Sequence, residues 1–186
     1  GRKTKNLIDS DEYKEIFPEV KLAADSKASG RWDTSKGGMY YAVGVGSNLA
    51  GRGGDLVVID DPHNSIEADS SAVREGVLEW WDQSMQTRLN NPKTGAFIII
   101  MQRLHEQDLT GHILANELGD EWDHLMLPAR YEVGHPTPMR STLNFTDPRT
   151  KEGELLWPNR IDEKTLATLE RSLGSYAAAG QLQQRP

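Results

Sequence analysis

The chain has 186 residues, and its 21 basic and 28 acidic side chains give a formal net charge of −7. This length fits one domain with a substantial core, since a domain commonly holds roughly 100–200 residues. Cysteine is absent, which excludes disulfides, thiolate zinc sites and a cysteine nucleophile. The longest apolar run, Phe97 to Met101, is shorter than the roughly 18 residues of a membrane span, and no signal peptide opens the chain. We therefore expect a soluble, cytoplasmic protein.

The excess acid lies in the middle of the chain. Residues 37–126 carry 14 acidic and 5 basic side chains, whereas residues 1–36 and 127–186 each have a net charge of +1. A protein that binds duplex DNA is expected to carry a basic surface, because neutralising phosphates supplies most non-specific affinity. The chain alone does not show that pattern.

The first predicted element is a short helix over residues 10–17, capped by Ser10 or Asp11 and ended by Pro18. Residues 25–38 are polar and indicate a loop or the approach to a hairpin. Three continuous apolar runs then predict strands, at residues 40–45, 56–59 and 96–101. Continuous runs are typical of parallel strands that are covered on both faces.

Helices are predicted between and after these strands. Apolar residues recur at one-turn spacing after a possible cap at residues 69–71, namely Val73, Val77, Trp81, Met85 and Leu89. A second helix is expected to follow Asp108 and to carry Leu109, Ile113 and Leu118. The third runs from Asp162 to Leu173 and ends at Gly174, a suitable residue for a helix end.

A fourth strand candidate covers residues 124–127, and Pro136, Pro138, Pro148 and Pro158 predict irregular structure over residues 132–160. Strands that alternate with helices indicate an α/β fold with a mainly parallel sheet.

Two adjacent carboxylates, Asp60 and Asp61, end the apolar run at residues 56–59. Open α/β folds bind ligands at the carboxyl ends of their strands, and neighbouring acids there favour a bound cation or a shared proton. In nucleotide hydrolases the first such acid holds Mg²⁺ and the second polarises the attacking water. The alternative is a turn in which Asp61 and Pro62 end the strand.

The next apolar run leads into Gln102 and Arg103. A polar side chain at that strand end could sense a γ-phosphate or the attacking water, or it could be a satisfied strand terminus. Arg103 could bind phosphate or pair with Asp108 or Glu106.

A wider set of motifs supports the interpretation of Asp60 and Asp61 as part of a nucleotide-hydrolase site. In chain order they are Gly-Arg-Gly-Gly-Asp-Leu-Val-Val-Ile-Asp-Asp-Pro at 51–62, Glu-Trp-Trp at 79–81, Thr-Arg-Leu at 87–89, Ile-Ile-Met-Gln-Arg-Leu-His-Glu-Gln-Asp-Leu-Thr-Gly-His at 99–112, Leu-Pro-Ala at 127–129 and Gln-Gln-Arg-Pro at 183–186. This series resembles the large subunit of tailed-phage terminases, the DNA-packaging motor. The resemblance implies an additional-strand P-loop ATPase fold of the RecA-like type.

The resemblance also implies roles for individual residues. Asp60 matches the Walker B acid that holds Mg²⁺, and Asp61 matches the catalytic carboxylate, where many terminases have Glu. Gln102 falls on the coupling motif, which is commonly a small hydroxyl residue, and Gln102 and Arg103 are expected to contact ATP. Arg52 matches an arginine that in some members reaches the ATP of a neighbouring subunit, since guanidinium can bridge phosphate oxygens. It could equally be a surface arginine in a Gly-rich turn.

Other candidate side chains have simpler interpretations. His105 and His112 are seven residues apart, which is no standard zinc spacing, so both are expected on a helix surface or at a cap. Trp80 and Trp81 cannot share one helix face. Trp81 is expected in the core, and Trp80 at a packing or interface position, with stacking on nucleic acid as a lesser alternative.

The chain contains no Walker A sequence of the form G-x-x-x-x-G-K-[ST] to cradle phosphates. We therefore expect residues 1–175 to form the second half of an ATPase domain and residues 176–186 to begin the hinge toward a nuclease domain. Alone, the chain is expected to be inactive.

As part of a full-length terminase, it would use ATP and Mg²⁺ to package double-stranded DNA into a procapsid in the host cytoplasm. Its partners would be DNA, the portal protein, the small terminase subunit and further copies in a ring. Two alternatives are a degenerate prophage interaction module and a metal-dependent nuclease that uses Asp60 and Asp61.

Overall fold

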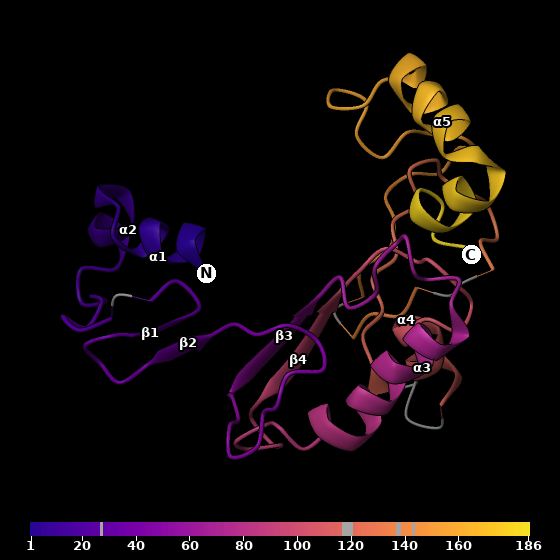
Figure 1. The fold of residues 1–186 in the computed structure, drawn as a ribbon. Coiled ribbons are helices and arrows are strands. Elements are labelled where there is room, and N and C mark those ends of the chain that lie inside the picture. Colours follow the sequence, from indigo (N-terminus) through magenta and orange to yellow (C-terminus); the bar gives the residue numbers. More distant parts are fainter. Residues whose placement is uncertain (27, 117–120, 137–138, 143) are drawn as a thin grey trace. The chain divides into compact units, whose positions relative to one another are not determined.

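The computed structural model describes the chain except residues 27, 117–120, 137–138 and 143. The described residues form two compact units, Gly1–Asn48 and Leu49–Pro186. Each unit is described by itself below (Figure 1).

The first unit consists of two short helices and a β-hairpin. The helices are α1 (Arg2–Ile8) and α2 (Asp11–Ile16), and the strands are β1 (Arg31–Asp33) and β2 (Met39–Tyr41). The predicted cap of α2 is confirmed, because the Ser10 hydroxyl accepts a hydrogen bond from the Tyr13 amide at 3.3 Å. Helix α1 was not predicted.

The strand predicted at residues 40–45 is shorter than expected and pairs in the opposite direction. It is confined to β2, which pairs antiparallel with β1 rather than joining a parallel sheet. The Trp32 and Tyr40 rings stack across the two strands with centroids 4.8 Å apart, and the Thr34 amide donates to the Gly38 carbonyl at 2.7 Å to close the turn. Cross-strand aromatic pairs and a tight turn favour a hairpin over a longer parallel strand.

The second unit contains the parallel sheet. Its elements are β3 (Leu56–Asp60), α3 (Ser71–Trp80), the π-helical turn η1 (Trp81–Met85), β4 (Ala96–Ile100), α4 (Leu109–Ala115) and α5 (Glu163–Gln181). Strands β3 and β4 pair in parallel, with Leu56 opposite Ala96 and Asp60 opposite Ile100. The described residues therefore form a mixed α/β structure with a two-stranded parallel sheet.

One face of this sheet packs on the core, and Figure 1 shows α3 and α4 on the same side of the two strands. The core consists of Ile59, Trp81, Met85, Leu109 and Ile113, and the Phe97 ring meets the Trp81 ring edge-on. The predicted core position of Trp81 is confirmed. Trp80 is half-buried and packs against the same cluster.

The other face of the sheet is exposed, so the prediction of coverage on both faces is wrong for the described residues. Leu56, Val58, Ile98 and Ile100 are 56%, 52%, 43% and 55% exposed. Along each strand these side chains alternate with those that face the core, since successive strand residues point to opposite faces. A continuous apolar run therefore does not by itself imply two covered faces.

Helix α3 follows the predicted apolar stripe, but its final turn is wider than expected. Val77, Trp81 and Met85 are buried, whereas Val73 is 39% exposed and Leu89 lies beyond the helical segment. The turn from Trp81 to Met85 is π-helical. It carries both Trp81 and Met85 into the core.

The predicted start sites of the last two helices are confirmed. The Asp108 carboxylate accepts a hydrogen bond from the Gly111 amide at 2.9 Å, and the Asp162 carboxylate accepts one from the Thr165 amide at 2.8 Å. Gly174 breaks α5 with a φ of 77°, as its predicted role at a helix end requires, but helical structure resumes and reaches Gln181.

The remaining chain is mostly irregular. The strand predicted at residues 124–127 is reduced to one bridge between His124 and Arg140. Residues 132–160 form no named strand or helix where the structure describes them. Leu118 and Pro138 lie outside the described residues. Among those that are described, no helix is both long and apolar enough to cross a membrane.

Arg130 fastens α5 to the preceding chain. Its guanidinium pairs with Glu163 and Glu170, each at 2.7 Å at the closest. Its amide donates to the Gln183 Oε1 at 2.9 Å, and its carbonyl accepts from the Gln183 Nε2 at 3.0 Å. The segment after α5 is therefore anchored to the same residue as the start of the helix.

Close packing of α5 on the loop after β4 predicts a cost for Gly180→Ala. A Cβ atom at Gly180 would lie 2.6 Å from the Arg103 carbonyl oxygen. We expect the free energy of unfolding, measured by urea denaturation, to fall by about 1–3 kcal/mol. The control is Gly76→Ala in α3, where nothing beyond its chain neighbours and the helix's own backbone lies within 4 Å of the added Cβ. That substitution should raise stability by about 0.5–1 kcal/mol, and equal effects of the two substitutions would contradict the predicted clash.

Candidate functional site

Asp60 and Asp61 lie at the carboxyl end of β3, and both are exposed. The Asp61 amide donates to the Ile100 carbonyl at 2.8 Å, so the acidic pair is held directly beside the end of β4. Asp61 has a φ of 43°, in the left-handed region that Asp tolerates better than most residues. Two adjacent carboxylates in this position can bind a hydrated divalent cation.

Gln102 and Arg103 follow the end of β4 on the same edge of the sheet. Because the strands are parallel and Asp60 lies opposite Ile100, Gln102 comes two residues beyond the partner of Asp60. Gln102 is exposed, whereas Arg103 is 7% exposed. The edge predicted from the sequence therefore brings the acidic pair and Gln102 to neighbouring strand ends.

Arg103 pairs with Asp108, one of the partners considered for it from the sequence. The Arg103 Nε lies 3.0 Å from each Asp108 carboxylate oxygen. The Asp108 side chain is 1% exposed and also accepts from the amides of Leu104 at 3.0 Å and Gly111 at 2.9 Å. One buried carboxylate thus folds the loop after β4 back onto the start of α4.

Arg52 lies before β3, at the opposite end of the strand from Asp60. The Gly54 amide and carbonyl hydrogen-bond to the Arg88 carbonyl and the Asn90 amide, which fixes the start of the strand. The five residues of β3 span about 13 Å at roughly 3.3 Å per residue. Within one chain, the structure does not bring Arg52 together with Asp60 and Asp61.

His63 is a buried polar residue that the sequence did not single out. It is 5% exposed, and its Nε2 accepts a hydrogen bond from the Leu109 amide at 2.9 Å. An accepting Nε2 places the ring proton of neutral His63 on Nδ1. This bond joins the loop after Asp61 to the first turn of α4. No periodicity or motif marks His63 in the sequence.

Burial lowers the pKa of His63. The nearby Asp108 carboxylate opposes this shift, whereas the charges of Arg74 and His105 lower the pKa further. The net effect favours the neutral ring that accepts from Leu109.

The two histidines that the sequence did single out make local contacts. The His112 Nε2 lies 3.1 Å from an Asp82 carboxylate oxygen, and the His105 Nδ1 accepts from the Gln107 amide at 3.0 Å. Within the part of the chain that the structure describes, no three His, Asp or Glu side chains gather into a metal-binding group.

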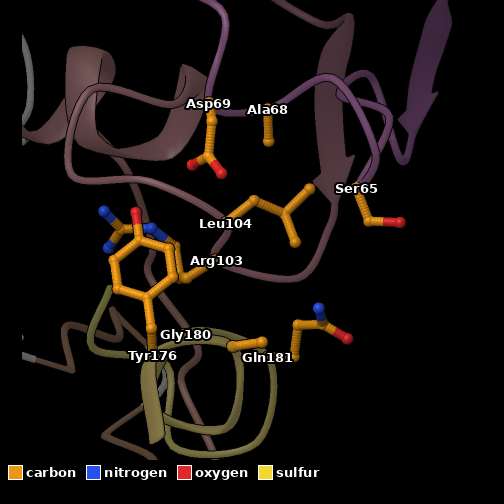
Figure 2. Close-up of a pocket in the computed structure, with 9 residues that line it drawn as sticks. Ser65, Ala68, Asp69, Arg103, Leu104, Tyr176, Gly180 and Gln181 are labelled. Carbon is orange, nitrogen blue, oxygen red and sulfur yellow. The ribbon is translucent and has the colours of Figure 1, made fainter. Parts of the chain in front are cut away.

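A cavity lies near this edge of the sheet (Figure 2). It has a volume of about 90 Å³ and is lined from three segments: the loop after β3, the loop after β4 and the second half of α5. Arg103 and Leu104 come from the second of these segments, and Tyr176 and Gln181 from the third. No sequence pattern predicted this cavity, because α5 is distant from both strands in the chain.

Comparison of the chain with known protein families and with curated proteins finds no match.

The lowered pKa of His63 predicts an acid-sensitive stability. Stability from this group is fully present above the unfolded pKa and is lost as the pH falls from about 6.5 toward the lower folded pKa. His63→Gln keeps an accepting oxygen but cannot titrate. We expect the free energy of unfolding of the variant to fall less than that of the wild type between about pH 7.5 and pH 5. Parallel pH profiles would contradict the prediction.

Proposed function

We propose that the chain is part of the ATPase domain of a terminase-like large subunit, which couples ATP hydrolysis to packaging of double-stranded DNA. The observation that carries this proposal is the position of Asp60 and Asp61. They end a parallel strand whose neighbour leads into Gln102 at the same sheet edge. In open α/β folds this edge is where ligands bind.

The proposed chemistry assigns one task to each polar group. Asp60 would hold Mg²⁺ for ATP, and Asp61 would polarise the attacking water. Gln102, just after the next strand, would sense the γ-phosphate. The family resemblance also implies a phosphate contact by Arg103. In the structure the Arg103 Nε bonds to Asp108 instead, so the phosphate contact stays a prediction.

The exposed sheet face supports further structure packed on this sheet, as in a RecA-like fold. Four apolar side chains, those of Leu56, Val58, Ile98 and Ile100, lie on this face. Parallel strands are normally covered on both faces, so further α/β structure of the same protein would bury these side chains. In the proposed motor, that structure includes the phosphate-binding loop.

The position of Arg52 supports action between subunits. It lies at the end of β3 opposite to the acidic pair, so it would act on the ATP of a neighbouring copy in a ring. The ring, the portal protein, the small subunit and a location in the host cytoplasm belong to the same proposal.

Asp61→Asn tests the catalytic assignment in the full-length protein. The amide cannot polarise the attacking water as a carboxylate does, so the rate of ATP hydrolysis should fall by about 10²- to 10⁴-fold while ATP binding is kept. The matched control is Asp55→Asn, just before the other end of β3, which should leave hydrolysis unchanged. Undiminished hydrolysis by Asp61→Asn would overturn the assignment.

Arg52→Ala tests action between subunits. Mixing Arg52→Ala subunits with Asp61→Asn subunits should partly restore ATP hydrolysis, because some interfaces then combine an intact Asp61 with an intact Arg52. Mixtures of Asp61→Asn with the double variant Arg52→Ala/Asp61→Asn should stay inactive. Absence of rescue at every mixing ratio would count against a role of Arg52 in a neighbouring site.

A further inference from the structure

The loop after the acidic pair Asp60 and Asp61 is tied to helix α4 by one side chain, that of His63. The ring is 5% exposed, and its Nε2 accepts a hydrogen bond from the Leu109 amide at 2.9 Å. Leu109 is the first residue of α4, and the first amides of a helix have no acceptor within the helix itself. His63 therefore caps α4 from a position 46 residues earlier in the chain.

The start of α4 holds the loops after both parallel strands. The Asp108 carboxylate, which precedes the helix, accepts from the Leu104 amide at 3.0 Å and so holds the loop after β4. The next residue, Leu109, is fully buried in the core and donates to His63 in the loop after β3. The two loops are fixed to neighbouring residues of one element, and His63 is the link on the side of the acidic pair.

Asp61 lies between two anchors on the backbone. Its own amide donates to the Ile100 carbonyl at 2.8 Å, and His63 follows two residues further on. Between the anchors Pro62 is buried, and its ring restricts the backbone φ at that position. Asp61 itself has a φ of 43°, a conformation that a non-glycine residue keeps only where the surrounding structure enforces it.

The position of the Asp61 carboxylate depends on this backbone. The side chain is exposed, and among the described residues no hydrogen bond or ion pair holds its carboxylate. A shift in the backbone of Asp61 therefore displaces the carboxylate directly. Displacement of a reacting group by about 1 Å can lower a rate by roughly 10²-fold.

We propose that His63 is a positioning residue for Asp61. By accepting from the Leu109 amide, it holds the loop after β3 so that the Asp61 carboxylate keeps its place at the sheet edge. The effect on hydrolysis rests on the proposed function, in which Asp61 polarises the attacking water. The effect on the backbone of Asp61 does not rest on it, because it follows from contacts within the chain.

Two amide side chains at position 63 form a matched pair of variants. The side-chain oxygen in His63→Gln can take the place of the imidazole Nε2, whereas the side chain in His63→Asn is one methylene shorter and falls short of the Leu109 amide. Hydrogen exchange at the Leu109 amide, followed by NMR, should be at least about tenfold faster in His63→Asn than in the wild type. The Asp61 amide resonance should shift as well. Both signals should stay close to those of the wild type in His63→Gln.

ATP hydrolysis is measured with the same pair in the full-length protein. His63→Asn should lower kcat by about 10- to 100-fold and change the KM for ATP by less than about threefold, because positioning rather than binding is lost. His63→Gln should keep kcat within about threefold of the wild type, since the acceptor is retained. If His63→Asn does not fold, His63→Gln decides: a tenfold loss of kcat with a protected Leu109 amide contradicts the proposal.

Two controls separate positioning from general destabilisation. Ile113→Val weakens the core packing of the same helix without touching the His63 bond, so it should leave kcat unchanged. In an Asp61→Asn background, the further change His63→Asn should lower kcat no more, because the residue that it positions is already disabled. A full additional loss in that double variant, or an equal loss in Ile113→Val, would show that His63 does not act through Asp61.

The outcomes for this proposal and for the catalytic one are distinguishable. If Asp61→Asn leaves hydrolysis unchanged while the Leu109 and Asp61 signals change in His63→Asn, the catalytic role of Asp61 is wrong and the positioning of its backbone stands. If Asp61→Asn abolishes hydrolysis while the signals and kcat are unchanged in His63→Asn, the positioning role of His63 is wrong and the catalytic role stands.

Discussion

The second unit depends on one buried carboxylate, that of Asp108. It accepts hydrogen bonds from the Arg103 Nε and from the amides of Leu104, His105 and Gly111, so three donors from the loop after β4 and one from the first turn of α4 converge on it. Removing it would leave the Arg103 guanidinium buried without its counter-charge, which typically costs about 3–5 kcal/mol. The same residue begins α4 and fixes the chain after β4. The sheet edge with Gln102 and the wall of the cavity therefore share one electrostatic anchor.

The sequence allowed local features of the fold to be predicted because their causes are local. Three residues were predicted near helix starts, namely Ser10, Asp108 and Asp162. Each side chain accepts a hydrogen bond from the backbone amide three residues further on. Gly174 was predicted to end a helix, and its positive φ matches that role, but packing beyond it lets α5 resume. The polar residues 25–38 did indicate a loop or the approach to a hairpin, but the antiparallel pairing of β2 with β1 was missed, since an apolar run does not specify the direction of its partner strand.

The candidate site likewise has a part that the sequence predicted and a part that it did not. The approach of the Asp60–Asp61 pair to Gln102 could be predicted, because parallel strands carry their carboxyl ends to one edge. The cavity could not, since it needs α5, whose tight contact with Arg103 at Gly180 is decided by tertiary packing. His63 was missed for a related reason: its partner, the Leu109 amide, lies 46 residues away. Burial of a single polar side chain leaves no periodic trace in a sequence.

Residue 130 contacts the chain on both sides of the break at Gly174 in α5. The Arg130 guanidinium forms ion pairs with Glu163 and Glu170 in the half before the break. Its backbone amide and carbonyl hydrogen-bond to the side chain of Gln183, just after the other half. Both ends of α5 are therefore tied to residue 130, so the break at Gly174 does not leave two independent segments. The second half of α5, held in this way, also forms one wall of the cavity.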